Sequence, residues 1–191
     1  RKPVLKNGVQ FMAEDDNLIS SQITGSIDMT YEIRIRKGSR KGDAESIAMI
    51  HARVYGEEYG YDRDFLYYVE RTLEELPDGK NPREEIWIVE NAHSVWGSVA
   101  VLERPGNAAQ IRWLILAPEI RGQGLGKELF GRAVEFIKRR GYESAFLTTQ
   151  SILEQSASIY RSFGFKIVEE KKTDCWGKQL IQQRYERSFE R

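Results

Sequence analysis

The feature that most constrains this chain is a glycine-rich turn between a strand and a helix. Residues 110–116 are almost continuously apolar apart from Arg112, which is typical of a strand covered on both faces. Pro118 ends this strand, and Arg121-Gly122-Gln123-Gly124-Leu125-Gly126 leads into a helix that begins near Gly124. A strand, a tight turn and a helix in this order indicate a fold that packs helices on a sheet.

The same turn has the properties of a phosphate-binding loop. The first turn of a helix leaves backbone N–H groups unpaired, and the helix dipole favours an anion there. Glycines let the backbone approach a pyrophosphate without a clash of Cβ atoms, and Arg121 adds a cationic fork. The pattern therefore predicts an anion site at the start of this helix.

Two common nucleotide-binding loops do not fit the spacing. A Walker loop requires Ser or Thr after Gly-Lys, whereas Glu128 follows Gly126-Lys127. A dinucleotide-binding fold requires Gly-x-Gly-x-x-Gly after an early strand, and these glycines are spaced differently and come late in the chain. A glycine-rich turn without any ligand stays open as an alternative at this point.

The remaining pattern predicts one mixed α/β domain over residues 31–191. The expected order is a strand, two helices, three strands, a helix, a strand, a helix and two strands, with helices on both faces of the sheet. These are expected at 31–36, 43–55, 64–76, 85–90, 95–103, 110–116, from about 124, 145–149, 154–163, 165–169 and 179–185. Residues 1–30 are polar and lack periodicity, so we expect an arm or linker whose role the sequence does not give.

Composition argues against several classes of protein. Lys plus Arg and Asp plus Glu both number 29, so no overall field favours nucleic acid, and no nucleic-acid partner is expected. Cys175 is the single cysteine, which excludes an intrachain disulfide and favours a reducing, cytoplasmic location. His51 and His93 lack metal-ligand spacing, and no apolar run could span a bilayer, so we expect neither a metal nor a membrane partner.

Two motifs resemble the landmarks of the GNAT N-acetyltransferases. Arg121 to Gly126, with Pro118 three residues before the arginine, is similar to the family's acetyl-CoA signature Arg/Gln-x-x-Gly-x-Gly/Ala. Ile159-Tyr160 followed by Gly164-Phe165 resembles its second landmark, a Leu-Tyr and then Gly-Phe. The resemblance covers about residues 31–186 and implies a mostly antiparallel sheet that is splayed between the strands 110–116 and 145–149.

Two further stretches resemble the acetyltransferase halves of bacterial fusions with a MarR-type winged-helix regulator. The first is Tyr59-Gly60-Tyr61-Asp62, before the second helix. The second combines Trp176-Gly177, Leu180 and Gln182-Gln183-Arg184-Tyr185-Glu186. Because residues 1–30 are too few for a winged helix, we expect a stand-alone enzyme domain.

The resemblance implies acetyl-CoA as cosubstrate and assigns residues to it. The freed backbone of Leu114, Ile115 and Leu116 would bond the pantetheine arm. The backbone N–H groups of the turn would bind the pyrophosphate, through Arg121, Gly122, Gln123, Gly124, Leu125 and Gly126. One departure is that Leu153 stands where many members carry a cofactor-binding Asn; Gln150, Ser151 and Gln155 are substitutes among which the sequence does not choose.

The resemblance also assigns the chemistry, which is attack of a neutral amine on a thioester. Tyr160 is the candidate general acid; a thiol of pKa about 8.5 is a tolerable leaving group, so a phenol need only assist. Ser156 replaces the family's alanine before this tyrosine. No motif fixes the general base, for which four carboxylates are candidates: Glu57, Glu58, Asp62 and Glu103.

The identity of the amine acceptor remains open at the level of sequence. A cluster of tyrosines in the expected two-helix region would suit an apolar or aromatic amine, and its members are Tyr59, Tyr61, Tyr67 and Tyr68. A non-catalytic acyl-CoA-binding or sensing module is the alternative to an N-acetyltransferase, and a different nucleotide-binding protein is the third hypothesis. A homodimer is expected from the family and from the exposed edge that the terminal strands would offer.

Overall fold

The structure is a computed structural model that describes residues 5–6, 9–13, 19–23 and 31–189. Seven strands from residue 31 onward form one sheet in the order β4-β5-β6-β7-β8-β10-β9. They are β4 (Tyr31–Lys37), β5 (Glu85–Glu90), β6 (Val95–Arg104), β7 (Ala108–Leu116), β8 (Ser144–Gln150), β9 (Lys166–Cys175) and β10 (Lys178–Ser188). All neighbours are antiparallel except β7 and β8, which are parallel. The predicted mixed, mostly antiparallel α/β fold is confirmed.

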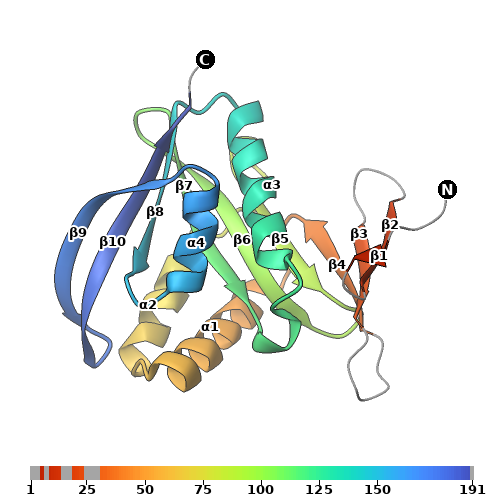
Figure 1. Cartoon of the computed structure of the whole chain (residues 1–191), viewed down its shortest axis with the longest axis horizontal. Helices are drawn as coiled ribbons and strands as arrows, with labels where there is room; N and C mark the ends of the chain where they lie inside the picture. The colour runs from red at the N-terminus through yellow and green to blue at the C-terminus, as the bar shows by residue number, and fades with distance from the viewer. Residues whose placement is uncertain (1–4, 7–8, 14–18, 24–30, 190–191) are drawn as a thin grey trace.

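Helices cover both faces of this sheet, as Figure 1 shows. One face carries α1 (Asp43–Tyr59) and α2 (Arg63–Leu73), and the other carries α3 (Leu125–Arg139) and α4 (Glu154–Ser162). A short 3-10 helix, η1 (Pro118–Ile120), connects β7 to the glycine-rich turn. Each helix buries one apolar stripe, as period-3.6 patterning requires.

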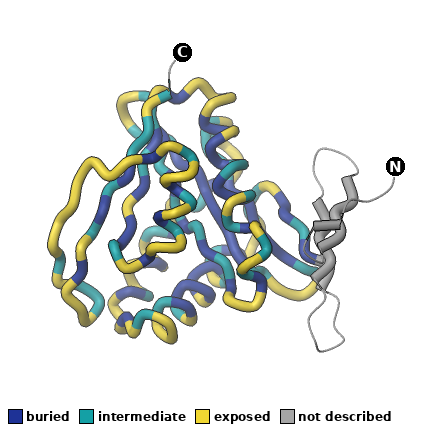
Figure 2. Tube along the Cα trace, viewed as in Figure 1, coloured by how far each residue is buried: buried dark blue, intermediate teal, exposed yellow. Residues whose placement is uncertain are grey.

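Two apolar cores result, one on each face of the sheet (Figure 2). On the α3 side, Leu129, Phe130 and Ile137 are fully buried against β5 to β8. On the α1 and α2 side, Ile47 and Phe65 pack against the other face of the same strands. The central strands are therefore buried on both faces, which is why their sequences read as nearly continuous apolar runs.

The segment expected to be an arm contains strands in the structure. β1 (Leu5–Lys6), β2 (Val9–Ala13) and β3 (Ile19–Ile23) pair antiparallel in succession and continue the sheet outward from β4. Their polar sequence gives little alternation, and strand formation depends more on the neighbouring strand than on local propensity. This segment also contains residues that are typical of turns, and these lie outside the described residues: Gly8, Asp15 to Asn17, and Gly25-Ser26.

Several element ends differ from the predicted ones. α1 continues through Gly56 to Tyr59 because Tyr55 and Tyr59 pack together, with ring centroids 5.5 Å apart, and Gly60 with φ of 64° then ends the helix. Its N-cap is Gly42 and not Asp43, whose buried carboxylate pairs with Arg36. The strands β9 and β10 are longer than predicted, because β9 is an exposed edge strand without apolar alternation.

A β-bulge in β7 prepares the site. The register with β6 shifts between Ser98 and Ala100, and Trp113 takes the left-handed φ of 49°, fixed by a 2.7 Å hydrogen bond from the Ser98 hydroxyl to the Trp113 carbonyl. Before the bulge Ile111 packs on the α3 side; after it Trp113 packs on the α2 side. One extra residue therefore reverses the faces of the strand and bends it.

The bent strand leaves its parallel neighbour. β7 pairs with β8 at three positions only, from Ala108 with Ser144 to Gln110 with Phe146. Beyond them the two strands diverge, which confirms the splay predicted between residues 110–116 and 145–149. Gly97 lets β6 stay close to the departing strand, since a Cβ there would lie 2.5 Å from the Ile115 carbonyl oxygen.

Candidate active site

Two adjoining cavities open where β7 and β8 diverge. The turn cavity, about 350 Å³, lies between the end of β7, the glycine-rich turn, α1 and α4. The gap cavity, about 130 Å³, lies between the splayed strands, α1 and α2. Both are lined by Tyr55, Leu114 and Leu153, so they adjoin along these three residues.

The glycine-rich turn beside the turn cavity has a row of free backbone donors. The N–H groups of residues 122–127 have no hydrogen-bond partner within the described part of the chain, and the first helical bond of α3 runs from Glu128 to the Gly124 carbonyl. Gly122 and Gly124 have φ of 78° and 83°, and a Cβ on either would meet nothing within 4 Å. Unpaired donors, a helix N-terminus and open space together suit an anionic phosphate group.

The guanidinium of Arg121 is engaged within the protein, whereas the sequence predicts that it binds the phosphate. Its Nε donates to the Leu116 carbonyl oxygen at 3.0 Å, and its Nη1 pairs with Glu58 at 2.7 Å. Its backbone N–H donates to the Pro118 carbonyl oxygen, because the residue closes η1. Both the side chain and the N–H therefore tie the turn to β7 and α1, a long-range pairing that the local motif does not show.

The other residues expected to bind the cofactor come together with one exception. The turn cavity is lined by Leu114, Ile115, Leu116, Arg121, Gly122, Gly124, Leu125 and Gly126. Gln123 does not line it, and its side-chain oxygen is buried without a partner within the described residues. Of the proposed substitutes for the missing asparagine, Gln155 lines the turn cavity and Gln150 lines the gap cavity.

Tyr160 lies on α4 at the wall of the gap cavity and is 6% exposed. Its ring is held by Phe130 and Tyr185, with centroids 5.1 and 5.6 Å away. Burial raises the pKa of Tyr160 to about 12, although hydrogen bonds with Ser156 and Thr149 act in the opposite direction. The phenol is therefore protonated at neutral pH and can donate a proton.

None of the four candidate bases lines either cavity. Glu58 is engaged by Arg121, and Asp62 caps α2 by accepting from the Asp64 N–H at 3.0 Å. Glu103 lies at the paired end of β7, opposite Ala109, and contacts Arg83. Glu57 is an exposed residue of α1 that is absent from both linings.

Two polar residues of the gap cavity were missed by the sequence. His51 is buried, its Nδ1 lies 2.8 Å from the Ile47 carbonyl oxygen, and burial lowers its pKa to about 4. Arg112, the one charged residue in the apolar strand, is half-buried in the same cavity. The charge of Arg112 in an otherwise apolar run was a usable signal, whereas nothing in the sequence places His51 opposite β7.

The tyrosine cluster is only partly at the site. Tyr68 lines the gap cavity and Tyr59 lines the turn cavity, while Tyr67 is 55% exposed and Tyr61 is buried in the core. Tyr55, Phe65 and Trp176, none of which was predicted to lie at the acceptor site, complete an aromatic wall around the gap cavity.

Two kinds of feature are absent from the described residues. No group of three or more His, Cys, Asp or Glu side chains within them could hold a metal ion. No described helix combines the length and the hydrophobicity needed to cross a bilayer.

The geometry defines an acyl-CoA-dependent acyltransferase. Free N–H groups at a glycine turn match a pyrophosphate, a splayed strand opens a path from them, and the path ends beside a buried, protonated phenol. The open turn cavity and the unpaired N–H groups of residues 122–127 therefore fit acetyl-CoA.

Comparisons with known proteins agree with this class. The sequence profile of the Acetyltransferase (GNAT) family matches residues 46–165, well over half of the chain. Uncharacterized N-acetyltransferase YjgM of Escherichia coli K12 is 29% identical over 132 residues, which cover 66% of this chain and 78% of that protein.

Solved structures share the fold. An acetyltransferase from Streptococcus agalactiae superposes with a TM-score of 0.65 at 19% identity, over 82% of this chain and 98% of that one. YncA of Salmonella typhimurium, solved with acetyl-CoA, has a TM-score of 0.60 at 16% identity, over 83% and 95%. The chain belongs to the GNAT family of acetyltransferases, and it is an N-acetyltransferase that uses acetyl-CoA.

Proposed function

We propose that this enzyme acetylates a primary amine by direct attack, with the donor in the turn cavity and the acceptor in the gap cavity. Acetyl-CoA supplies an activated acetyl thioester when it is bound. The observation that carries the assignment is the wall that the two cavities share at Tyr55, Leu114 and Leu153, with Tyr160 on the gap-cavity side of it. No cysteine lines either cavity within the described part of the chain, which favours direct transfer over an acyl-enzyme.

The glycine turn holds the donor in this proposal. The N–H groups of Gly122, Gln123, Gly124, Leu125 and Gly126 face the pyrophosphate, and the backbone of Leu114, Ile115 and Leu116 binds the pantetheine arm. Arg121 acts indirectly, because its bonds to Leu116 and Glu58 fix the turn beside the strand. Charge-assisted hydrogen bonds from several N–H groups supply the anchoring energy.

Tyr160 acts as general acid toward the departing sulfur. Its high pKa keeps the proton on the phenol, and a proton donor of this kind contributes about 10²- to 10⁴-fold to a rate. The apolar rings around the gap cavity exclude water, which protects the thioester from hydrolysis.

Thermal denaturation with acetyl-CoA, CoA or ATP tests the donor assignment. A ligand that binds only the native state adds about 2.7 kcal/mol of stability when its free concentration is about 100 times its Kd. We expect acetyl-CoA and CoA to raise Tm and ATP to have no effect. Absence of a shift with either CoA species contradicts the assignment, and acetyl transfer to a panel of amines tests catalysis separately.

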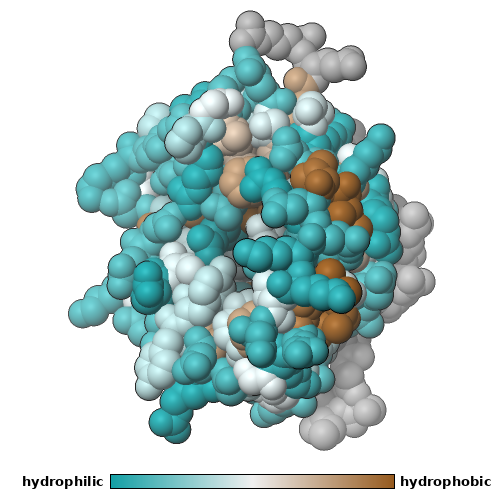
Figure 3. Space-filling view, turned by 90° about the vertical axis from the view of Figure 1, so that its left-hand side faces the viewer, coloured by the Kyte–Doolittle hydropathy of each residue, from teal (hydrophilic) through white to brown (hydrophobic). Residues whose placement is uncertain are grey.

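We also propose a homodimer that pairs through the β9 edge. β9 is the last strand of the sheet, and exposed apolar residues lie on it and its neighbour: Ile167, Val168 and Ile181. The side of the molecule that carries β9 and β10 is otherwise largely hydrophilic (Figure 3). Light scattering should give twice the mass of 22.1 kDa, and Val168→Lys should give the monomer mass.

Three further assignments rest on the sequence. The Tyr59–Asp62 and Trp176–Glu186 stretches support a relation to the acetyltransferase halves of MarR fusions. The free Cys175 supports a cytoplasmic location. Equal numbers of basic and acidic residues support a function without nucleic acid or membrane, which binding assays with DNA and anionic vesicles can check.

A further inference from the structure

The gap cavity contains a cation without a counterion. Among the described residues that line it, Arg112 is the one with a permanent charge, and none is Asp or Glu. Within the described residues the guanidinium has one hydrogen bond, from Nη2 to the Tyr68 hydroxyl at 3.5 Å, which is the outer limit of such a bond, and it lies 5.0 Å from the centroid of the Trp113 ring. An arginine has five N–H donors, so most of its hydrogen-bonding capacity is unused.

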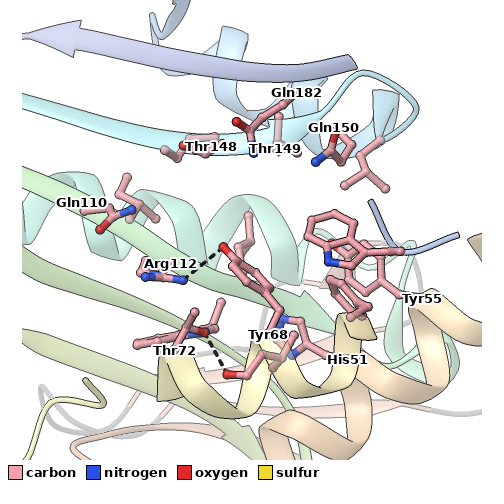
Figure 4. A pocket seen from close by; sticks show the side chains of 18 of the residues that line it. His51, Tyr55, Tyr68, Thr72, Gln110, Arg112, Thr148, Thr149, Gln150 and Gln182 are labelled. Atoms are coloured by element: carbon pink, nitrogen blue, oxygen red, sulfur yellow. Dashed lines mark hydrogen bonds between the residues drawn. The ribbon is translucent and has the colours of Figure 1, made fainter. Parts of the chain in front are cut away.

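Other polar groups of the cavity also lack partners. Figure 4 shows Arg112 and Gln110 on one strand facing Thr148 and Gln182 across the gap. The side chains of Thr148 and Gln182 have no hydrogen bond within the described residues, and the Gln110 oxygen accepts from Arg104, which leaves its amide NH₂ group available. Hydroxyl and amide donors beside a free guanidinium are the groups that bind a carboxylate.

The opposite wall is apolar and aromatic. Phe65 and Trp176 stack edge to face with centroids 4.9 Å apart, and Tyr55 packs on Phe65 at 4.6 Å. His51 on the same wall is neutral, and its Nε2 has no partner within the described residues. An acceptor in this cavity therefore meets one cationic end and one apolar end.

We propose that the acceptor is an amino acid with an apolar or aromatic side chain, whose carboxylate is bound by Arg112. This inference rests on the proposed function, because it assumes that the amine enters the gap cavity. The carboxylate on Arg112 directs the amine toward Leu114, where the two cavities meet, and the side chain lies against the aromatic wall. A polyamine or another polycation is disfavoured, because no carboxylate of the described lining would receive its second charge.

Matched acceptors test the proposal. L-phenylalanine, L-phenylalaninamide and phenethylamine share an aromatic body and an amine, but only the first has a carboxylate. With rates corrected for the neutral-amine fraction, we expect kcat/KM for phenylalanine to exceed that for the amide at least tenfold. Arg112→Gln should abolish this preference and leave the amide within twofold of the wild-type rate; Arg112→Lys should fall between, because an ammonium lacks the planar fork.

Arg71→Gln is the control, since Arg71 is an exposed arginine of α2 that lines neither cavity. It should retain the wild-type preference. Equal rates for phenylalanine and its amide in the wild type, or an equal loss of both in Arg112→Gln, would overturn the proposal, while acetyl transfer itself would still support the proposed function.

A binding measurement gives a readout without turnover. In calorimetric titrations in the presence of CoA, N-acetylphenylalanine should bind the wild-type enzyme at least tenfold tighter than N-acetylphenethylamine, and Arg112→Gln should remove this difference. Equal affinity in the wild type overturns the carboxylate site. Failure of CoA itself to bind would instead contradict the donor assignment, so the two failures are distinguishable.

Discussion

At the scale of single residues, the phenol of Tyr160 shows how packing prepares a side chain for chemistry. Phe130 and Tyr185 fix the ring, and Ser156 replaces the family's alanine with a hydroxyl that interacts with the phenol. Burial keeps the proton in place, since the phenolate would be poorly solvated. The departure at Ser156 therefore adjusts the same group that the motif identifies.

Tyr160→Phe should lower kcat about 10²-fold and leave KM for acetyl-CoA within about twofold, because only the proton donor is lost. A good leaving group needs modest assistance, which places the expected effect at the low end of the usual range. Steady-state kinetics measures both constants. An unchanged kcat would show that Tyr160 only packs, and Tyr67→Phe on the exposed side of α2 serves as the control.

His51 links the acidity of the medium to the stability of the fold. Its pKa is lowered to about 4 by burial, against 6.5 in the unfolded chain. Below pH 6.5 His51 binds a proton in the unfolded chain but stays neutral in the native state. The contribution of His51 to the free energy of unfolding is therefore fully present above pH 6.5 and is lost as the pH decreases toward 4. The shift corresponds to a loss of up to about 3 kcal/mol.

Urea denaturation at pH 7.5 and pH 4.5 can measure this loss in the wild type and in His51→Gln. The variant should show a smaller decrease in the free energy of unfolding, because glutamine does not titrate. Replacement of the exposed His93 by Gln is the matched control and should retain the wild-type decrease. Identical pH dependence in the wild type and His51→Gln would exclude this role for His51.

At the scale of elements, the turn and the start of α3 form the donor site only in one backbone conformation. Gly124 has φ of 83°, which costs an L-residue about 1–2 kcal/mol. In that conformation the N–H groups of residues 122–127 stay free, and the open space beside Gly124 admits a ligand. A change of backbone there removes several donors together.

Gly124→Ala should therefore destabilise the protein by about 1–2 kcal/mol and weaken CoA binding at least tenfold. Gly106→Ala is a close control, because Gly106 has φ of 77°, also has nothing near its missing Cβ, and lies in the turn between β6 and β7. It should lose similar stability and bind CoA normally. Calorimetric titration with CoA measures Kd for both variants. Equal affinity in Gly124→Ala and Gly106→Ala would argue against a CoA site at the N–H groups of residues 122–127.

At the scale of the whole molecule, a buried ion network connects the first helix to the sheet. Arg36 on β4 donates to Glu90 at the end of β5 at 2.6 Å and to Asp43 at the start of α1 at 2.5 Å. These charged side chains are at most 9% exposed. The network holds α1, and with it Tyr55 and His51, against the strands that form the cavities.

Arg36→Leu should cost about 3 kcal/mol of stability, because the buried Asp43 loses its cation, whereas Glu90 keeps Arg34 at 2.8 Å. The exposed pair of Lys80 and Asp78 is the control, and Lys80→Ala should leave the free energy of unfolding unchanged within the error of the measurement. Chemical denaturation measures both. A loss below 1 kcal/mol for Arg36→Leu would mean that the helix is held by its apolar face alone.

Local patterns were enough to predict most elements and the donor motif. Periodicity and turn residues indicated the seven strands and four helices from residue 31 onward, with errors mainly at element ends, but they missed β1, β2 and β3. The spacing from Pro118 through Gly126 to Tyr160 indicated the family. The predicted end of α1 was wrong because the packing of Tyr55 on Tyr59 carries the helix past Gly56. The predicted end of β9 was wrong because this exposed edge strand has no apolar alternation.

The positions of the other residues at the site follow from contacts between distant parts of the chain. The left-handed Trp113 reverses the faces of β7, Arg121 turns to Leu116 and Glu58, and His51 and Arg112 meet in one cavity although 61 positions separate them in the numbering. These outcomes depend on packing between distant segments, whose energies no local pattern contains. The sequence thus predicted where the donor binds, and the fold supplied the charge by which we infer the acceptor.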